Sequence, residues 1–166
     1  MVKVVIHHED KWGEAFFRIL VQRMKNENII TKRKGKWVGL KTIHQVADCN
    51  PRTSKLLINH LLDKEIKAVL ITRDADGDIA HAQSVINTHI PDNYPISISI
   101  GIFNYEIEDL IILDKGMTLI PHPSEYLEQH INYQKSDLPN FAQSLNLKTS
   151  PTMNHPIIQT IIKLFS

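Results

Sequence analysis

Apolar and polar positions follow two periods along the chain, one typical of strands and the other typical of helices. Three apolar runs have the length and composition of strands, at 2–7, 66–73 and 95–104, and the last alternates isoleucine with serine or glycine. Apolar residues three or four positions apart predict helices at 12–24, 40–49, 52–62, 79–89, 105–113, 124–131, 138–145 and 156–165. Strands that alternate with helices predict an α/β fold: a mainly parallel central sheet flanked by helices, with a short helical C-terminal extension.

Local signals mark the ends of several of these elements. Pro51 suits a first helical position after Asn50, Asp78 is placed to cap the helix at 79–89, and Pro91 ends that helix. We expect residues 1–114 to form the α/β core, with a basic loop or small hairpin and a helical insert at about 26–64. Residues 115–166 are expected to form an irregular, helical extension that packs on the same core.

Cysteine usage and hydropathy exclude several classes of protein. The single Cys49 excludes an internal disulfide and a multi-cysteine zinc site, and it suits a reducing compartment. No signal peptide is visible, and no apolar run approaches the roughly 18 residues that a membrane span requires. We therefore expect a cytoplasmic protein.

Positive charge is concentrated in one short segment, although the formal net charge of the chain is only +1. Lys32, Arg33, Lys34 and Lys36 lie directly before Trp37. Cations on such a loop can hold a phosphate backbone while the indole stacks on a base, so these five residues are candidates for nucleic-acid binding. The alternative is a solvated loop whose Trp37 anchors it to the core.

Carboxylates follow the second strand at alternate positions. Asp74, Asp76 and Asp78 come at the end of a mostly apolar run, and side chains at alternate positions of an extended strand share one face. Clustered carboxylates repel one another unless a cation lies among them. The cation that suits oxygen ligands in an α/β protein is Mg²⁺ or Mn²⁺, which predicts metal-assisted phosphate chemistry.

The other two strands are also followed by acids. Glu9 and Asp10 follow the first strand, and Glu106 and Glu108 follow the third. If the strands are parallel neighbours, these groups converge at one edge of the sheet, where one or two metal ions would polarise a phosphodiester and activate water. Each group also has an ordinary interpretation as a turn, a helix cap or a first-turn acid.

Two other kinds of site have a similar acidic pattern. An EF-hand is excluded, because the glycine follows at the fourth position of the motif and Val85 stands at the twelfth. A phosphatase of the haloacid dehalogenase type remains an alternative, with Asp74 as its nucleophile. His7, His8 and His81 are placed to shuttle protons or contact a metal or phosphate, with structural hydrogen bonding as the alternative.

In order and spacing, these motifs resemble the Toprim fold of topoisomerases, primases and overcoming-lysogenization-defect nucleases, and most of all small stand-alone Toprim-like proteins. Those open with a strand ending in VEGxTExxF, and the segment HEDKWGEAFF at 8–17 keeps the glutamate, a second acid and the aromatic pair. The DxD motif corresponds to Asp74 and Asp76. A later E-A-W-L-L-A-D segment is similar to EDLIILD at 108–114, and the likeness covers 2–114.

The resemblance implies a Mg²⁺-dependent nuclease or related phosphotransfer enzyme. Glu9 would act as general acid or base or as a metal ligand, Asp74 and Asp76 would hold the metal, and Asp78 and Glu108 would assist. Asp10 replaces the usual glycine, which adds negative charge where a polyanion must approach. Nucleic acid is the expected partner, with a separate ATPase and a homodimer as further possibilities. A non-catalytic module that binds a metal or a basic protein is the remaining alternative.

Overall fold

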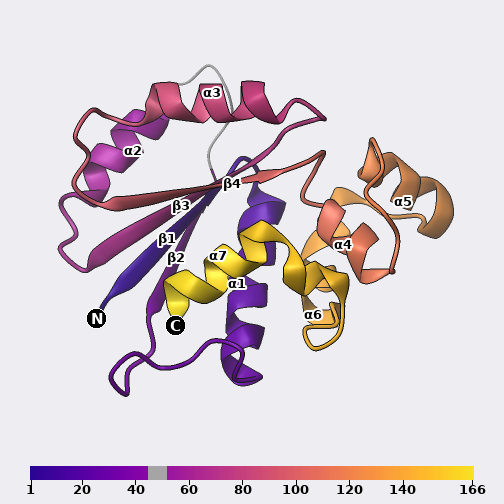
Figure 1. Cartoon of the computed structure of the whole chain (residues 1–166), viewed down its shortest axis with the longest axis horizontal. Coiled ribbons are helices and arrows are strands. Elements are labelled where there is room, and N and C mark those ends of the chain that lie inside the picture. Colours follow the sequence, from indigo (N-terminus) through magenta and orange to yellow (C-terminus); the bar gives the residue numbers. More distant parts are fainter. Residues whose placement is uncertain (45–51) are drawn as a thin grey trace.

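Four parallel strands form one sheet in the computed structural model, which describes residues 1–44 and 52–166. The strands are β1 (Lys3–His8), β2 (Gly39–His44), β3 (Ile66–Asp74) and β4 (Ser97–Phe103). Their order in the sheet is β2-β1-β3-β4, and each neighbouring pair is parallel (Figure 1). The predicted fold class, a parallel α/β sheet with flanking helices, is confirmed.

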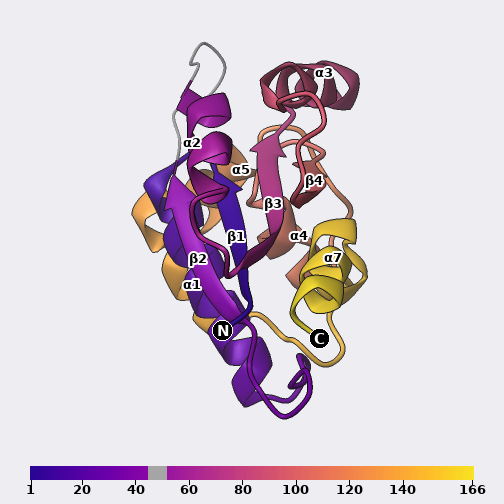
Figure 2. The same ribbon diagram turned by 90° about the vertical axis from the view of Figure 1, so that its left-hand side faces the viewer.

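Helices cover both faces of the sheet, as Figures 1 and 2 show. One face carries α2 (Arg52–His60) and α3 (Ile79–His89), and the other carries α1 (Lys11–Asn26) and α7 (Pro156–Phe165). Shorter elements connect β4 to α7: α4 (Asp109–Asp114), α5 (Pro123–Ile131), η1 (Lys135–Asp137), α6 (Leu138–Ser144) and η2 (Pro151–Asn154). In Figure 1 the helices α4, α5 and α6 lie beyond one end of the sheet.

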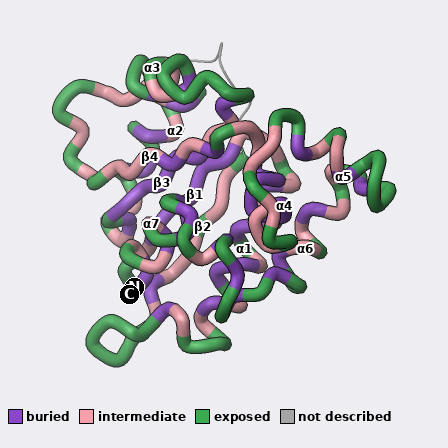
Figure 3. Tube along the Cα trace, turned by 45° about the vertical axis from the view of Figure 1, so that its right-hand side comes forward, coloured by how far each residue is buried: buried purple, intermediate pink, exposed green. Residues whose placement is uncertain are grey.

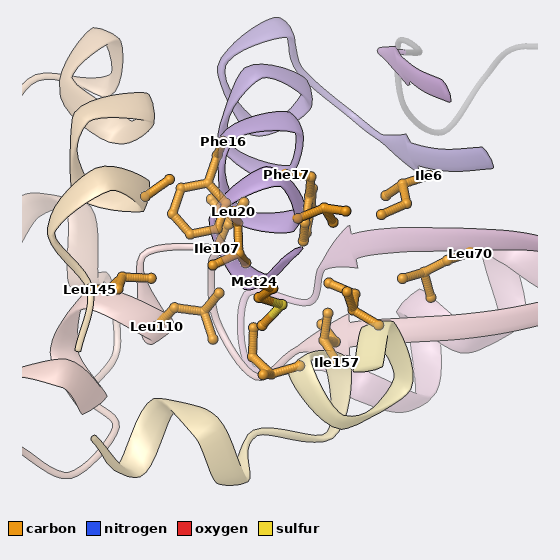
Figure 4. Close-up of a cluster of buried hydrophobic side chains, with 14 of the residues drawn as sticks. Ile6, Phe16, Phe17, Leu20, Met24, Leu70, Ile107, Leu110, Leu145 and Ile157 are labelled. Atoms are coloured by element: carbon orange, nitrogen blue, oxygen red, sulfur yellow. The ribbon is translucent and has the colours of Figure 1, made fainter. Parts of the chain in front are cut away.

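Side chains from the two faces of the strands enter two separate apolar clusters. Val4, Ile6 and Leu70 pack with α1 and α7, whereas Val5 and Val69 pack with α2 and α3. Figure 4 shows the first cluster, in which side chains of α1 meet those of the sheet, α4 and α7. Strands that are buried on both faces need nearly continuous apolar sequence, which explains the apolar runs of β1 and β3 (Figure 3).

The small-residue face of β4 is the surface on which α7 packs. A Cβ atom on Gly101 would lie 2.8 Å from Cγ1 of Ile157, so a larger residue would push the helix away from the strand. The opposite face of β4 presents Ile98, Ile100 and Ile102 to the α2–α3 side. Isoleucine alternates with serine and glycine in β4 because the small residues allow the C-terminal helix to approach the strand closely.

One predicted helix is wrong. Residues 40–44 belong to the edge strand β2, and the rest of the predicted helix at 40–49 lies outside the described residues, as do Cys49 and Pro51. This edge strand pairs with a neighbouring strand on one side only. Its apolar residues are therefore interspersed with half-exposed polar ones, at a spacing similar to that of a helix. Pairing with β1 over Lys3–His8 determines the conformation, a case of tertiary structure overriding local pattern.

Other element boundaries are close to those predicted. The helix α3 covers 79–89 as expected, and Asp78 caps it by accepting a hydrogen bond from the backbone N–H of His81. The helix predicted at 105–113 starts later, at Asp109. Within the described part of the chain, every helix is too short or too polar to cross a membrane.

His155 gives the docking of α7 a dependence on pH. Its Nδ1 accepts a hydrogen bond from the backbone N–H of Ile157, and its ring stacks on Phe103 with 5.5 Å between the centroids. Burial lowers the pKa of His155 from 6.5 to about 4. Between these two values the unfolded chain binds the extra proton. The free energy of unfolding therefore decreases as the pH falls, by up to about 1.4 kcal/mol per pH unit.

We predict that His155→Asn removes the loss of stability that His155 causes as the pH falls from 6.5 to 4, so the variant gains stability relative to the unaltered protein over this range. Asparagine retains an acceptor at the start of α7 and does not titrate. Urea unfolding of both proteins across this range measures the effect. The pKa of Asp109, raised to about 6 by burial, contributes with the opposite sign, but it is common to both proteins and cancels in the difference. Parallel curves would contradict the role of His155.

Candidate functional site

The sheet has a switch point between β1 and β3, where the chain leaves in opposite directions. From β1 it crosses by α1 to β2, and from β3 it crosses by α3 to β4 on the other side. Parallel α/β sheets bind ligands in the crevice beyond the carboxyl ends of such strands. Glu9 directly follows β1, and Asp74 is the last residue of β3.

Glu9 and Asp74 meet at this switch point, as the sequence predicts. The backbone N–H of Asp74 donates a hydrogen bond to Oε1 of Glu9 over 3.2 Å. One ring nitrogen of His8 and one carboxylate oxygen of each acid all lie within 4.8 Å of one another. The Oδ1 atom of Asp74 is buried and has no hydrogen-bond partner. An unpaired buried carboxylate oxygen is costly, which is the condition that a bound cation would relieve.

The surroundings of Asp74 oppose its negative charge. Burial raises the pKa of its carboxyl group well above the usual value, and the charges of Glu9 and Glu108 raise it further. The ammonium group of Lys135 acts in the other direction. Glu108 therefore lies near enough to act on Asp74, but among the described residues the group that could share one ion is His8, Glu9 and Asp74.

Asp10 has a structural role as well as a place beside the site. Its Oδ1 accepts hydrogen bonds from the backbone N–H groups of Trp12 and Gly13, so it caps α1. Its Oδ2 lies 3.7 Å from Nε2 of His8 and 3.7 Å from Nζ of Lys135. Burial alone would raise the pKa of Asp10, but His8, the N–H of Gly13 and Lys135 lower it. The negative charge at this position is consequently retained and locally balanced.

Glu108 is fully buried and held by two residues of the C-terminal extension. The hydroxyl group of Tyr133 donates to Oε1 over 2.5 Å, and Nζ of Lys135 donates to Oε2 over 2.9 Å. Burial would lower the pKa of Lys135, but the negative charges of Glu108 and Asp74 raise it overall. The extension thus places one ammonium group among the acids of the core.

The structure does not bring Asp76 and Asp78 into this group. The strand ends at Asp74, and Asp76 stands in a turn with a positive φ of 48°, where its backbone N–H donates to the carbonyl oxygen of Tyr105. Asp78 is the cap of α3. The three aspartates therefore do not share one face, and the ordinary interpretation of turn and cap describes Asp76 and Asp78.

The remaining acids after β4 are also structural. The Oε2 atom of Glu106 accepts a hydrogen bond from the backbone N–H of Ser124 and so joins the β4–α4 loop to α5. The Oδ2 atom of Asp109 accepts from the backbone N–H of Tyr105. These bonds fix the loop that positions Glu108.

The basic segment 32–37 lies at the amino ends of the strands, opposite the carboxyl ends where the acids lie. It precedes β2, whereas the acids follow β1 and β3, and six-residue β1 separates the two edges by about 20 Å (Figure 1). A bridge between Arg33 and Lys36 makes it a small hairpin, as expected. Lys32, Lys34 and Lys36 are exposed, but Arg33 binds the carbonyl oxygens of Lys163 and Ser166.

Trp37 is an anchor of this hairpin. It is partly buried against the main core, as the alternative interpretation expected. The ammonium groups of Lys25 and Lys32 lie 5.9 and 5.5 Å from the centre of its ring. The indole is therefore already engaged by cations of the chain itself, and the lysines remain the groups available to a phosphate backbone.

Lys135 and Tyr133 were not predicted from the sequence. Both belong to the extension, where the local sequence carries no motif, and only the packing of that segment beside α4 brings them to Glu108. His8 stood out only through its position next to Glu9. The signal that could have strengthened it is Gly13, because a Cβ there would lie 1.8 Å from Cδ2 of His8.

The site therefore combines a buried imidazole, two clustered acids with one unpaired oxygen, and an ion pair supplied by the extension. Such a group suits a divalent cation by its chemistry. Comparison with protein-family models, with curated proteins and with solved structures found no match to this chain.

Proposed function

We propose that the protein is a metal-dependent phosphodiester hydrolase that acts on nucleic acid, a nuclease or a related phosphotransfer enzyme. The observation that supports this most is the meeting of Glu9 and Asp74 at the switch point, with Oδ1 of Asp74 buried and unpaired. The site lies where parallel α/β sheets place their ligands.

The charge balance of the site favours a divalent cation. Four carboxylates gather there, those of Glu9, Asp10, Asp74 and Glu108, and the nearby ammonium group is that of Lys135. This excess of negative charge would repel a phosphodiester. A bound dication would reverse the local charge, polarise the phosphoryl oxygen and lower the pKa of a bound water.

Each residue then has a role that its position allows. Asp74 holds the cation through its unpaired oxygen. Glu9 is half-buried and is oriented beside Asp74 by the backbone N–H of that residue, where its carboxylate can bind the cation or accept a proton from water. Lys135, fixed by Glu108, presents positive charge beside the reacting phosphate.

The exposed lysines of the hairpin support nucleic acid as the substrate. A groove of about 740 Å³ lies along α1 and β2, and its cations are engaged within the chain. Arg18 pairs with Glu14, Arg23 pairs with Glu27, and Lys25 donates to the carbonyl oxygen of Val38. The helix α1 begins near the carboxyl ends of the strands, where the acids lie, and the hairpin comes after its last residue in the chain. The groove lies along this helix, on the flank between the acids and the hairpin. A strand bound along this flank would contact exposed lysines far from the acids, which suits a polymer better than a small phosphate ester.

We predict that Asp74→Asn and Glu9→Gln each reduce metal-dependent cleavage of labelled DNA or RNA by at least about a hundredfold. Both changes keep the shape of the side chain, and Asp74→Asn also relieves repulsion by Glu9, so the melting temperature should stay the same or rise. Cleavage is measured with Mg²⁺ and Mn²⁺ on single-stranded and double-stranded substrates.

Asp76→Asn is the matched control. It removes the same charge two residues away, and asparagine tolerates the positive φ of that turn, so activity should persist. Undiminished cleavage by Glu9→Gln would contradict the proposal. Hydrolysis of phosphate monoesters with a covalent adduct on Asp74 would favour the haloacid dehalogenase alternative, and metal binding without any cleavage would favour the non-catalytic module.

We predict that Lys34→Gln combined with Lys36→Gln weakens nucleic-acid binding and lowers its salt dependence. If both lysines contact phosphates of a duplex, the slope of log affinity against log salt falls by about two. The control is Lys115→Gln with Lys148→Gln, two exposed lysines outside the hairpin with the same change of charge. Fluorescence anisotropy at several salt concentrations gives both slopes. Equal slopes in the two double variants would remove the hairpin from the binding surface.

A further inference from the structure

His8 is a fully buried imidazole that the proposed reaction has not used. It is the last residue of β1, and its ring lies between Phe17 and Phe103, with centroid separations of 5.7 and 6.2 Å. Gly13 makes the space for it, because a side chain there would occupy the position of the ring. The ring is therefore rigidly held at the edge of the acidic group.

Hydrogen bonding fixes which ring nitrogen carries the proton. Oγ1 of Thr72 donates its single hydrogen to the carbonyl oxygen of His7 over 2.7 Å. The same oxygen lies 2.9 Å from Nδ1 of His8, and with its hydrogen already used it accepts from Nδ1–H. The neutral ring then carries its proton on Nδ1, and Nε2 has a free lone pair.

Nε2 of His8 is buried without a hydrogen-bond partner. Oδ2 of Asp10 lies 3.7 Å from it, beyond hydrogen-bonding distance. A bare lone pair beside carboxylates is unfavourable in the absence of a cation. Histidines that bind metals show this same arrangement, in which one nitrogen donates to a fixed acceptor and the other binds the ion.

We infer that Nε2 of His8 joins Glu9 and Asp74 as the third ligand of the metal, so that the resident ion is a first-row transition-metal dication and not Mg²⁺. The inference rests on the proposed function only for the reaction that the ion serves. Imidazole favours manganese, iron, cobalt or zinc over magnesium, whereas an all-oxygen site does not discriminate in this way.

The separations suit this coordination after a small adjustment. Two ligands bound at about 2.1 Å to one ion lie roughly 3 to 4.2 Å apart. One ring nitrogen of His8 and one carboxylate oxygen of each acid lie within 4.8 Å of one another, and the half-buried side chain of Glu9 can close the difference by a change of rotamer. His8 and Asp74 are held by the sheet, so they form the fixed part of the site.

Metal binding by the full chain tests the inference directly. Isothermal titration with Mn²⁺, Co²⁺, Zn²⁺ and Mg²⁺ should give at least about tenfold tighter binding of the three transition metals. In the unaltered protein prepared with isotopically labelled histidine, electron spin-echo spectra of bound Mn²⁺ should show coupling to a histidine nitrogen. Equal affinities together with no nitrogen coupling would overturn the inference, and this spectrum requires no variant.

Three variants separate ligation from folding. His8→Asn keeps a donor toward Thr72 but lacks the Nε2 position, so transition-metal affinity should fall at least about tenfold while Mg²⁺ affinity is unchanged. Thr72→Val removes the acceptor that orients the ring and should cost about 10- to 100-fold, and Thr72→Ser should restore binding. His81→Asn, at an exposed histidine of α3, is the control.

The outcome is distinguishable from failure of the proposed function. Tight, nitrogen-coordinated metal binding without cleavage of any nucleic acid would uphold the site and refute the hydrolase. Cleavage that depends on Glu9 and Asp74 but is supported equally by Mg²⁺, with no nitrogen coupling, would uphold the hydrolase and refute His8 as a ligand.

Discussion

The pairing of β1 with β3 is the constraint on which the site depends. The last residue of β1, His8, and the first residue of β3, Ile66, are 58 positions apart in the chain, and yet the two strands are neighbours in the sheet. Their parallel register sets His7 opposite Ile71, so the residues that follow both strands emerge at one edge. Because the crossovers leave in opposite directions, no connection covers that edge between them. Glu9 and Asp74 are in contact for this reason alone.

The C-terminal extension supplies the hydrogen bonds and the positive charge that the buried acid Glu108 requires at this edge of the sheet. The core alone would bury Glu108 beside two other acids, and an unpaired buried carboxylate costs several kcal/mol or takes up a proton. Tyr133 and Lys135 supply the hydrogen bonds and the charge that Glu108 requires. The same extension ends in α7, which packs on the glycine of β4. Folding of the last third of the chain and assembly of the acidic site are therefore linked through common packing.

The sequence predicted the elements whose periodicity is strong, and it failed where long-range pairing decides. The helix at 79–89 and the ends of β1 and β3 were recognisable because capping residues and apolar runs appear in the local sequence. The ends of the two strands identified Glu9 and Asp74 as candidates. The edge strand β2 has a mixed pattern that only its pairing with β1 resolves. Asp76 looked like a ligand because alternate positions share a face while the chain stays extended, and the extended backbone stops at Asp74. Lys135 was not predictable, since its role arises from tertiary packing.

His8 and Gly13 illustrate how a tertiary requirement can still leave a trace in sequence. A histidine at the end of a buried strand has an ordinary explanation, and so has a glycine near the start of a helix. Together they are less ordinary, because glycine in the first turn of a helix costs stability relative to alanine and must be offset by something that needs the space. The imidazole occupies that space, and Thr72 orients it with its bare nitrogen toward the acids. A structural histidine at this position would need the same space, so the feature that distinguishes a ligand is the unpartnered Nε2.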